Sequence, residues 1–127
     1  LPGVILAICL PQLNVTTIDS NGKKTRFQQQ VKIELGLKNL DVQNIRAEEC
    51  QAEPFDIVIS RAFASLEDMI NWTAQLCAPQ GVFLAMKGQY NAQELSQLPE
   101  GYALIASHEL MVPGTQGSRH LMEIGRA

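Results

Sequence analysis

The sequence lacks several features that would place it in a specialised class of protein. It has only three cysteines, Cys9, Cys50 and Cys77, an odd number without a CxxC pair. This pattern excludes a paired disulfide framework and a zinc knuckle, and it indicates reduced core thiols in a cytoplasmic protein. The apolar run from Leu1 to Leu10 is far shorter than the roughly 20 residues of a membrane span. It also lacks the basic leader and cleavage site of a signal peptide, so we expect no membrane segment.

Charge is scarce and unevenly distributed along the chain. Charged residues make up 18% of the 127 residues, and the net charge is −3. Residues 1–40 hold five basic and two acidic side chains, a net of +3, whereas residues 41–127 hold five basic and eleven acidic ones, a net of −6. A local basic segment can bind phosphates even on an acidic protein. The 46% hydrophobic content excludes disorder, and the length suits a single domain over residues 1–127.

Runs typical of strands alternate with runs typical of helices. We expect helices over residues 4–10, 21–35, 65–77 and 91–98, and strands over residues 14–18, 42–47, 55–60, 82–86, 102–112 and 120–124. In the second helix the apolar residues Phe27, Val31 and Leu35 fall on one face, and Gly36 is a natural end. The alternation predicts an α/β fold, with a mostly parallel sheet covered by helices on both faces.

The last two predicted strands should pair differently from the others. Only seven residues separate Val112 from His120. A parallel crossover needs about a dozen residues or more, so these strands should form an antiparallel hairpin at the sheet edge. A mostly parallel sheet with a C-terminal antiparallel hairpin is less common than a plain doubly wound sheet, which narrows the choice of fold.

Polar side chains follow four of the predicted strands: Asp19, Glu48, Arg61 and Lys87. Ligands of open α/β sheets bind beyond the carboxyl ends of the strands. Asp19 could hold the two hydroxyls of a ribose, or simply cap the next helix. Glu48 and the backbone of Ala47 could read an adenine edge, or form a solvated loop. Arg61 needs a carboxylate, a phosphate or a planar ring as its partner.

Other candidate residues carry weaker signals. Lys23 and Arg26 lie in the first turns of the predicted basic helix, where they form either a solvated face or a phosphate contact. Arg119 lies at the end of the hairpin loop, within reach of the same ligand or of RNA. Residues 108–112 begin like a zinc-protease motif but lack its second histidine, so we expect no metal site. No nucleophile motif, phosphate loop or complete GxGxxG occurs, and we assign no catalytic residue.

Several of these segments match one pattern in order: Leu1–Gly3, Thr17–Ser20, Arg46–Glu49, Phe55–Ala64, Met86–Gly88 and Arg119–Leu121. From end to end the chain resembles the bacterial 16S ribosomal RNA guanine-N7 methyltransferase family, also called glucose-inhibited division protein B. The block from Ile59 to Ala62 (Ile-Ser-Arg-Ala) is specific to this family, whereas many methyltransferases share Phe-Asp.

The resemblance implies a Rossmann-like, class I S-adenosylmethionine-dependent methyltransferase. It implies S-adenosylmethionine as the methyl donor and N7 of a guanosine in 16S ribosomal RNA, naked or in the small-subunit particle, as the acceptor. By the family pattern, the cofactor-binding residues are Leu1, Asp19, Ala47, Glu48 and Arg61. The basic surface that would face RNA comprises Lys23, Arg26, Lys87 and Arg119. Guanine N7 carries a lone pair at neutral pH, so the transfer needs orientation and electrostatics rather than a general base.

The sequence departs from the family at its start. In the family, a helical region, the first strand and a glycine-rich loop precede Leu-Pro-Gly, and all three are missing here. The first strand is central in this fold, and its loop forms one wall of the cofactor site. We therefore expect the chain alone to bind S-adenosylmethionine poorly or not at all. An open sheet edge would also allow the chain to dimerise.

Three alternatives remain open from the residues. The first is a methyltransferase that acts on another RNA or on a small molecule. The second is a non-catalytic RNA-binding module, which would bind RNA in a salt-dependent way without binding the cofactor. The third is a nicotinamide dehydrogenase, which the terminal hairpin and the incomplete glycine fingerprint make a weaker match.

Overall fold

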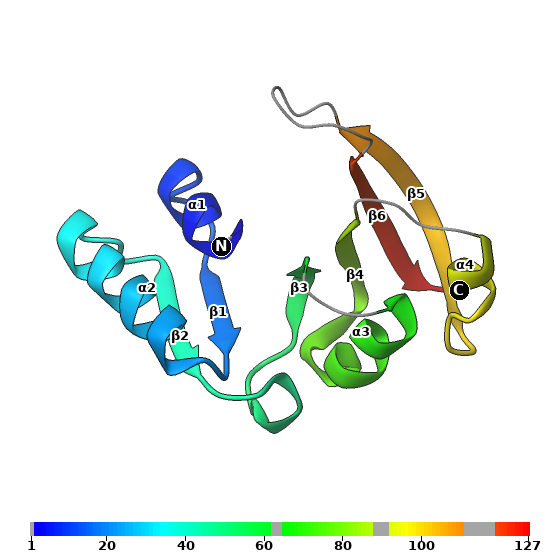
Figure 1. Cartoon of the computed structure of the whole chain (residues 1–127), viewed down its shortest axis with the longest axis horizontal. Helices are drawn as coiled ribbons and strands as arrows, with labels where there is room; N and C mark the ends of the chain where they lie inside the picture. Colours follow the sequence, from blue (N-terminus) through cyan, green and yellow to red (C-terminus); the bar gives the residue numbers. More distant parts are fainter. Residues whose placement is uncertain (1, 62–64, 88–91, 111–118) are drawn as a thin grey trace. The chain divides into compact units, whose positions relative to one another are not determined.

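The computed structural model describes residues 2–61, 65–87, 92–110 and 119–127 (Figure 1). The chain divides into two compact units, Leu1–Cys50 and Gln51–Ala127. The first unit contains α1 (Pro2–Cys9), β1 (Val15–Asp19), α2 (Gly22–Leu35), β2 (Leu40–Asn44) and the 3-10 turn η1 (Ala47–Glu49). The second contains β3 (Phe55–Ser60), α3 (Leu66–Thr73), the 3-10 turn η2 (Ala74–Leu76), β4 (Cys77–Lys87), α4 (Ala92–Ser96), β5 (Tyr102–Leu110) and β6 (Arg119–Arg126). The expectation of a single domain stays a prediction.

The first unit is built on two parallel strands. β1 pairs with β2 in a register that runs from Val15 opposite Leu40 to Asp19 opposite Asn44. A small core joins Val4 and Ala7 of α1 to Leu40 and Val42 of β2. The Asn39 side-chain amide donates hydrogen bonds to the carbonyls of Ala7, Leu10 and Leu13. The bond to Ala7 satisfies one of the last carbonyls of α1, and the three contacts together fix α1 and the segment after it beside the sheet.

Helix α2 begins and ends where the sequence predicts. The Asn21 side chain caps its start by accepting hydrogen bonds from the N–H groups of Lys23 and Lys24. Gly36 ends it in the left-handed conformation, with φ of +62°.

The face of α2 that packs inward is more polar than the apolar pattern suggests. Thr25 and Gln28 are buried, whereas Phe27 and Leu35 are 54% and 57% exposed. Val31 packs against the core of the first unit. The Thr17 hydroxyl donates a 2.8 Å hydrogen bond to Gln28 Oε1. This bond satisfies the buried amide oxygen of Gln28, which would otherwise be costly to bury.

The sheet of the second unit has the strand order β3-β4-β6-β5. β3 and β4 are parallel, while β6 is antiparallel to both β4 and β5. The predicted antiparallel pair at the end of the chain is thus confirmed. β6 lies between β4 and β5, so the antiparallel pair lies at one edge of the described sheet, with β3 at the other (Figure 1).

Two predicted boundaries in the second unit are wrong. α3 ends at Thr73 rather than at residue 77, and β4 begins at Cys77 rather than at residue 82. Between Phe55 opposite Cys77 and Ile57 opposite Val82 the strand register shifts. At Gly81 an added Cβ would lie 2.6 Å from the Asp56 carbonyl oxygen, so the shift depends on glycine at this close approach.

Helix α3 covers one face of this sheet. The Ser65 side chain caps its start by accepting a hydrogen bond from the Asp68 N–H at 3.1 Å, as its sequence predicts. The helix buries Leu66, Met69 and Ile70 in one cluster with the strand residues Phe83, Ala85, Met122 and Ile124. Because side chains alternate along a strand, Lys87 shares its face of β4 with Phe83 and Ala85. Among the helices described, none is long and apolar enough to cross a membrane.

Candidate functional site

In the first unit, the candidate residues lie at one edge of the two-stranded sheet. Asp19 ends β1 opposite Asn44, which ends β2. The Ile45 N–H donates a 3.0 Å hydrogen bond to the Asp19 carbonyl, and the turn Ala47–Glu49 follows directly. The parallel pairing therefore brings Asp19 and the Ala47–Glu48 segment to the same edge, as parallel strands require.

Asp19 also has a local structural role. Its Oδ1 accepts a 2.8 Å hydrogen bond from the Asn21 N–H, which leads into α2. An ionised carboxylate has about four lone-pair sites on its two oxygens. The helix cap itself is Asn21 rather than Asp19. The hydrogen bond from the Asn21 N–H and a ribose contact are compatible, since one hydrogen bond does not exhaust the acceptor capacity of the half-buried Asp19 side chain.

The other candidates of the first unit lie on its surface. Glu48 is exposed at the turn, with Ala47 half-buried beside it. Lys23 and Arg26 are exposed on the first turns of α2. Leu1 lies outside the described residues.

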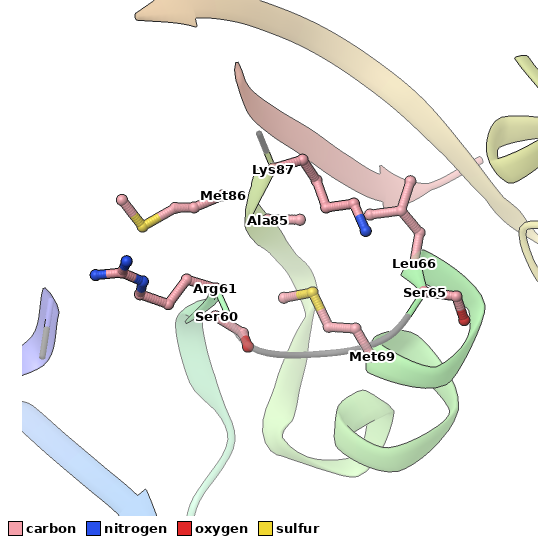
Figure 2. Close-up of a pocket in the computed structure, with 8 residues that line it drawn as sticks. All are labelled: Ser60, Arg61, Ser65, Leu66, Met69, Ala85, Met86 and Lys87. Carbon is pink, nitrogen blue, oxygen red and sulfur yellow. The ribbon is translucent and has the colours of Figure 1, made fainter. Parts of the chain in front are cut away.

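In the second unit, a small and open surface pocket lies at the carboxyl ends of β3 and β4, beside the start of α3 (Figure 2). It is lined by Ser60, Arg61, Ser65, Leu66, Met69, Ala85, Met86 and Lys87. The structure thus brings together Arg61 and Lys87, as their positions after parallel strands predict. Arg119, the first residue of β6, pairs with Leu110, and its side chain lies outside the described part.

The two basic residues of this pocket point in different directions. Figure 2 shows the Arg61 and Met86 side chains extending to one side of the strand ends, with Lys87 and Met69 on the other side, toward α3. Strand alternation explains the difference, because Ser60 pairs with Ala85 and the next residue on each strand faces the opposite way. The exposed Arg61 and the inward Lys87 therefore belong to different faces of the sheet.

Lys87 makes an ion pair that the sequence analysis missed. Its Nζ lies 2.9 Å from Glu94 Oε1, and the two side chains are only 18% and 19% exposed. The pair joins the end of β4 to α4 across the segment 88–91. Lys87 and Glu94 lie on different elements, so neither helical nor strand spacing relates them. The only signal of the pair in the sequence is a basic residue that precedes a short helix with an acidic residue.

The remaining reactive side chains do not gather into a centre. Cys50 and Cys77 are buried, as expected for core thiols, whereas Cys9 is exposed, so its expected place in the core is wrong. In the described ranges, no three His, Cys, Asp or Glu side chains come close enough to hold a metal ion. The edge of the first unit offers a carboxylate and backbone N–H groups, which suit the binding of a nucleoside, and the edge of the second unit offers two cationic side chains.

The class I methyltransferase fold combines parallel strands with one antiparallel strand that lies next to the sheet edge. Polar groups at the carboxyl ends of the strands complete its definition. Solved structures agree with this class. TrmN from Thermus thermophilus matches with a TM-score of 0.75 at 16% identity, over 98% of this chain and 40% of that one. The N-methyltransferase NodS from Bradyrhizobium japonicum matches with a TM-score of 0.71 at 15% identity, over 98% and 80%. At such identities the likeness concerns the fold alone.

Within this class, the chain belongs to the GidB family, described as rRNA small subunit methyltransferase G, whose family model matches residues 1–122. Ribosomal RNA small subunit methyltransferase G of Marinobacter nauticus is 51% identical over 128 residues, covering 100% of this chain and 60% of the relative. Its counterpart in Pseudomonas aeruginosa is 52% identical over 127 residues, covering 99% and 59%. The chain thus spans about 60% of the length of these relatives, and the family resemblance of the sequence is confirmed.

Proposed function

We propose that the protein transfers a methyl group from S-adenosylmethionine to N7 of a guanosine in 16S ribosomal RNA, in the cytoplasm. The family match over residues 1–122 carries this proposal, together with identity above 50% to relatives named for small-subunit ribosomal RNA methylation. The geometry supports it, because each unit presents its polar residues at the carboxyl ends of parallel strands.

The residues at the edge of the first unit suit the adenosyl part of the cofactor. The Asp19 carboxylate can accept hydrogen bonds from both ribose hydroxyls while it also accepts the bond from the Asn21 N–H. The Ala47 and Glu48 segment, one element further along the same edge, would lie along the adenine, and Leu1 would contact the cofactor. S-adenosylmethionine supplies an electrophilic methyl group on a sulfonium when it is bound. The exposed Arg61 would support it by charge or position.

The acceptor chemistry requires little of the protein beyond placement. Guanine N7 holds a lone pair at neutral pH, so no side chain has to remove a proton first. The pocket at β3 and β4 would orient the base and exclude water, which contributes to the rate by proximity and preorganised charge. The target guanosine must be unstacked, as in a single-stranded loop or after base flipping.

The basic side chains would contact the RNA around that base. Lys23 and Arg26 are exposed at the start of α2, where they are available to phosphate oxygens. In the second unit Arg119 would add a further phosphate contact, and Lys87 would contact the RNA from the pocket at β3 and β4. Such phosphate contacts make binding weaker as salt rises.

The test uses the complete gene product that contains this chain, with small-subunit particles from cells that lack this methyltransferase. We expect about one 7-methylguanosine per particle, mapped by cleavage chemistry specific for that base. Arg61→Ala should lower the methylation rate at least tenfold, while Lys38→Gln, at an exposed lysine outside the site, should not. Salt-dependent RNA binding without methyl transfer would favour the non-catalytic module instead.

A further inference from the structure

Lys87 combines two properties that a lysine on an RNA-binding surface seldom has. It lines the pocket at the ends of β3 and β4. It is also largely buried, with its ammonium 2.9 Å from Glu94 Oε1. Lysines that contact phosphates are usually exposed and free to move, as Lys23 is here. The ammonium of Lys87 is instead held in place, since the pair fixes it between β4 and α4.

The neighbouring carboxylate restricts what Lys87 can bind. A phosphate at the ammonium would bring a second anion close to Glu94, in a poorly solvated place where like charges repel strongly. A neutral acceptor such as a carbonyl oxygen meets no such repulsion. An ammonium has three N–H donors, so the bond to Glu94 leaves donor capacity for a carbonyl in the pocket.

We propose that Lys87 donates a hydrogen bond to O6 of the acceptor guanine, and that Glu94 is the positioning residue that holds the ammonium there. This inference rests on the proposed function. Guanine carries an acceptor at position 6, whereas adenine carries an amino group that would set donor against donor. Lys87 would thereby select guanine over adenine through the atom next to N7, and N7 itself would stay free.

The charge balance of the reaction favours a paired lysine over a lone one. The N7 lone pair forms the new bond to the methyl carbon, and the electrons of the broken carbon–sulfur bond go to sulfur. The purine therefore gains the positive charge that the sulfonium loses. A lone ammonium beside O6 would oppose this charge. With Glu94 at 2.9 Å the local charge is close to zero, and the hydrogen bond remains.

The decisive experiment measures kcat/KM for the complete gene product on particles that carry guanosine or 2-aminopurine at the methylated nucleotide. 2-Aminopurine keeps N7 but has no O6. We expect Lys87→Ala to lower kcat/KM at least tenfold on guanosine. The wild type should lose a similar factor on 2-aminopurine, where Lys87→Ala causes no further loss. Equal losses on both bases would overturn the inference, because a structural role does not depend on O6.

A second variant separates base contact from folding. Exchanging the pair, Lys87→Glu with Glu94→Lys, keeps an ion pair between β4 and α4 but places a carboxylate in the pocket. We expect it to restore the unfolding midpoint that Lys87→Ala lowers, without restoring activity on guanosine. Recovery of that activity would refute the O6 contact.

Two further outcomes are informative. If Lys87 contacts a phosphate, Lys87→Ala should reduce the slope of log binding against log salt by about one; this result would overturn the inference. The control is Lys38→Gln, which replaces an exposed lysine outside the pocket. It should change neither base preference nor activity. A wild-type protein that methylates no guanosine would instead refute the proposed function itself.

Discussion

Cys77 begins β4 inside the core of the second unit, and burial raises the pKa of its thiol above the ordinary value of 9.0. Arg126 opposes this shift through a hydrogen bond and its charge, but burial is the larger effect. The folded state therefore keeps the proton at a pH where the unfolded chain has lost it. Its contribution to stability is complete below about pH 9 and is lost as the pH rises through the folded pKa.

The prediction concerns Cys77→Ala under reducing conditions. As the pH rises above about 9, the free energy of unfolding of the wild type should fall by a component of at most about 1.4 kcal/mol per pH unit. The variant should lack that component, although its stability at pH 7 is lower because of the cavity. Urea unfolding at several pH values measures both, and identical slopes for the two proteins would contradict the assignment.

Asp19 is the residue at which local structure and proposed function can be separated. Asp19→Asn keeps a side-chain oxygen that can accept from the Asn21 N–H, so α2 should still form. The amide has no negative charge and binds two ribose hydroxyls less well. We expect about a tenfold higher Kd for S-adenosylmethionine in the complete gene product, measured by calorimetric titration. Asp41→Asn, at an exposed position on β2, is the control; an unchanged Kd for Asp19→Asn would remove Asp19 from the site.

At the scale of elements, the end of α2 depends on one backbone conformation. Gly36 has φ of +62°, and nothing lies within 4 Å of a Cβ added there. Gly36→Ala should therefore destabilise the protein by about 1 kcal/mol through backbone strain alone. Gly22→Ala at the start of the same helix, whose φ is ordinary, should cost much less. Chemical denaturation measures the difference in stability between the two variants. Equal losses of stability would show that the left-handed conformation of residue 36 adds no strain in Gly36→Ala.

The same helix illustrates how far element prediction reaches. Its end followed from Gly36, because a terminal glycine is a local signal. Its cap is Asn21 and not Asp19, which the sequence offered for that role. Its inward face did not follow from the apolar pattern, since Gln28 is buried through a bond to Thr17, eleven residues away in the chain. The start of β4 was missed for a similar reason. Cys77 joins the strand by pairing with Phe55, a partner that is remote in sequence.

At the scale of the whole molecule, the open sides of two strands carry the next prediction. In the described part of the chain, β1 pairs only with β2, and β3 pairs only with β4. The 127 residues span about 60% of the length of their relatives. We expect them alone to bind S-adenosylmethionine much more weakly than the complete gene product does, because they span only part of the relatives' length. Calorimetry showing micromolar affinity for the 127 residues alone would contradict this.

The sequence alone determined the alternation of strands and helices, the antiparallel strands at the end and the family, because these depend on local periodicity, loop length and motif order. It also placed Asp19, Glu48, Arg61 and Lys87 after strands. Only the tertiary structure decided that Arg61 and Lys87 face opposite sides of the sheet, and that Lys87 pairs with Glu94. Side-chain partners across a fold depend on strand register and on how helices pack on the sheet. The spacing of residues along the chain predicts neither of these.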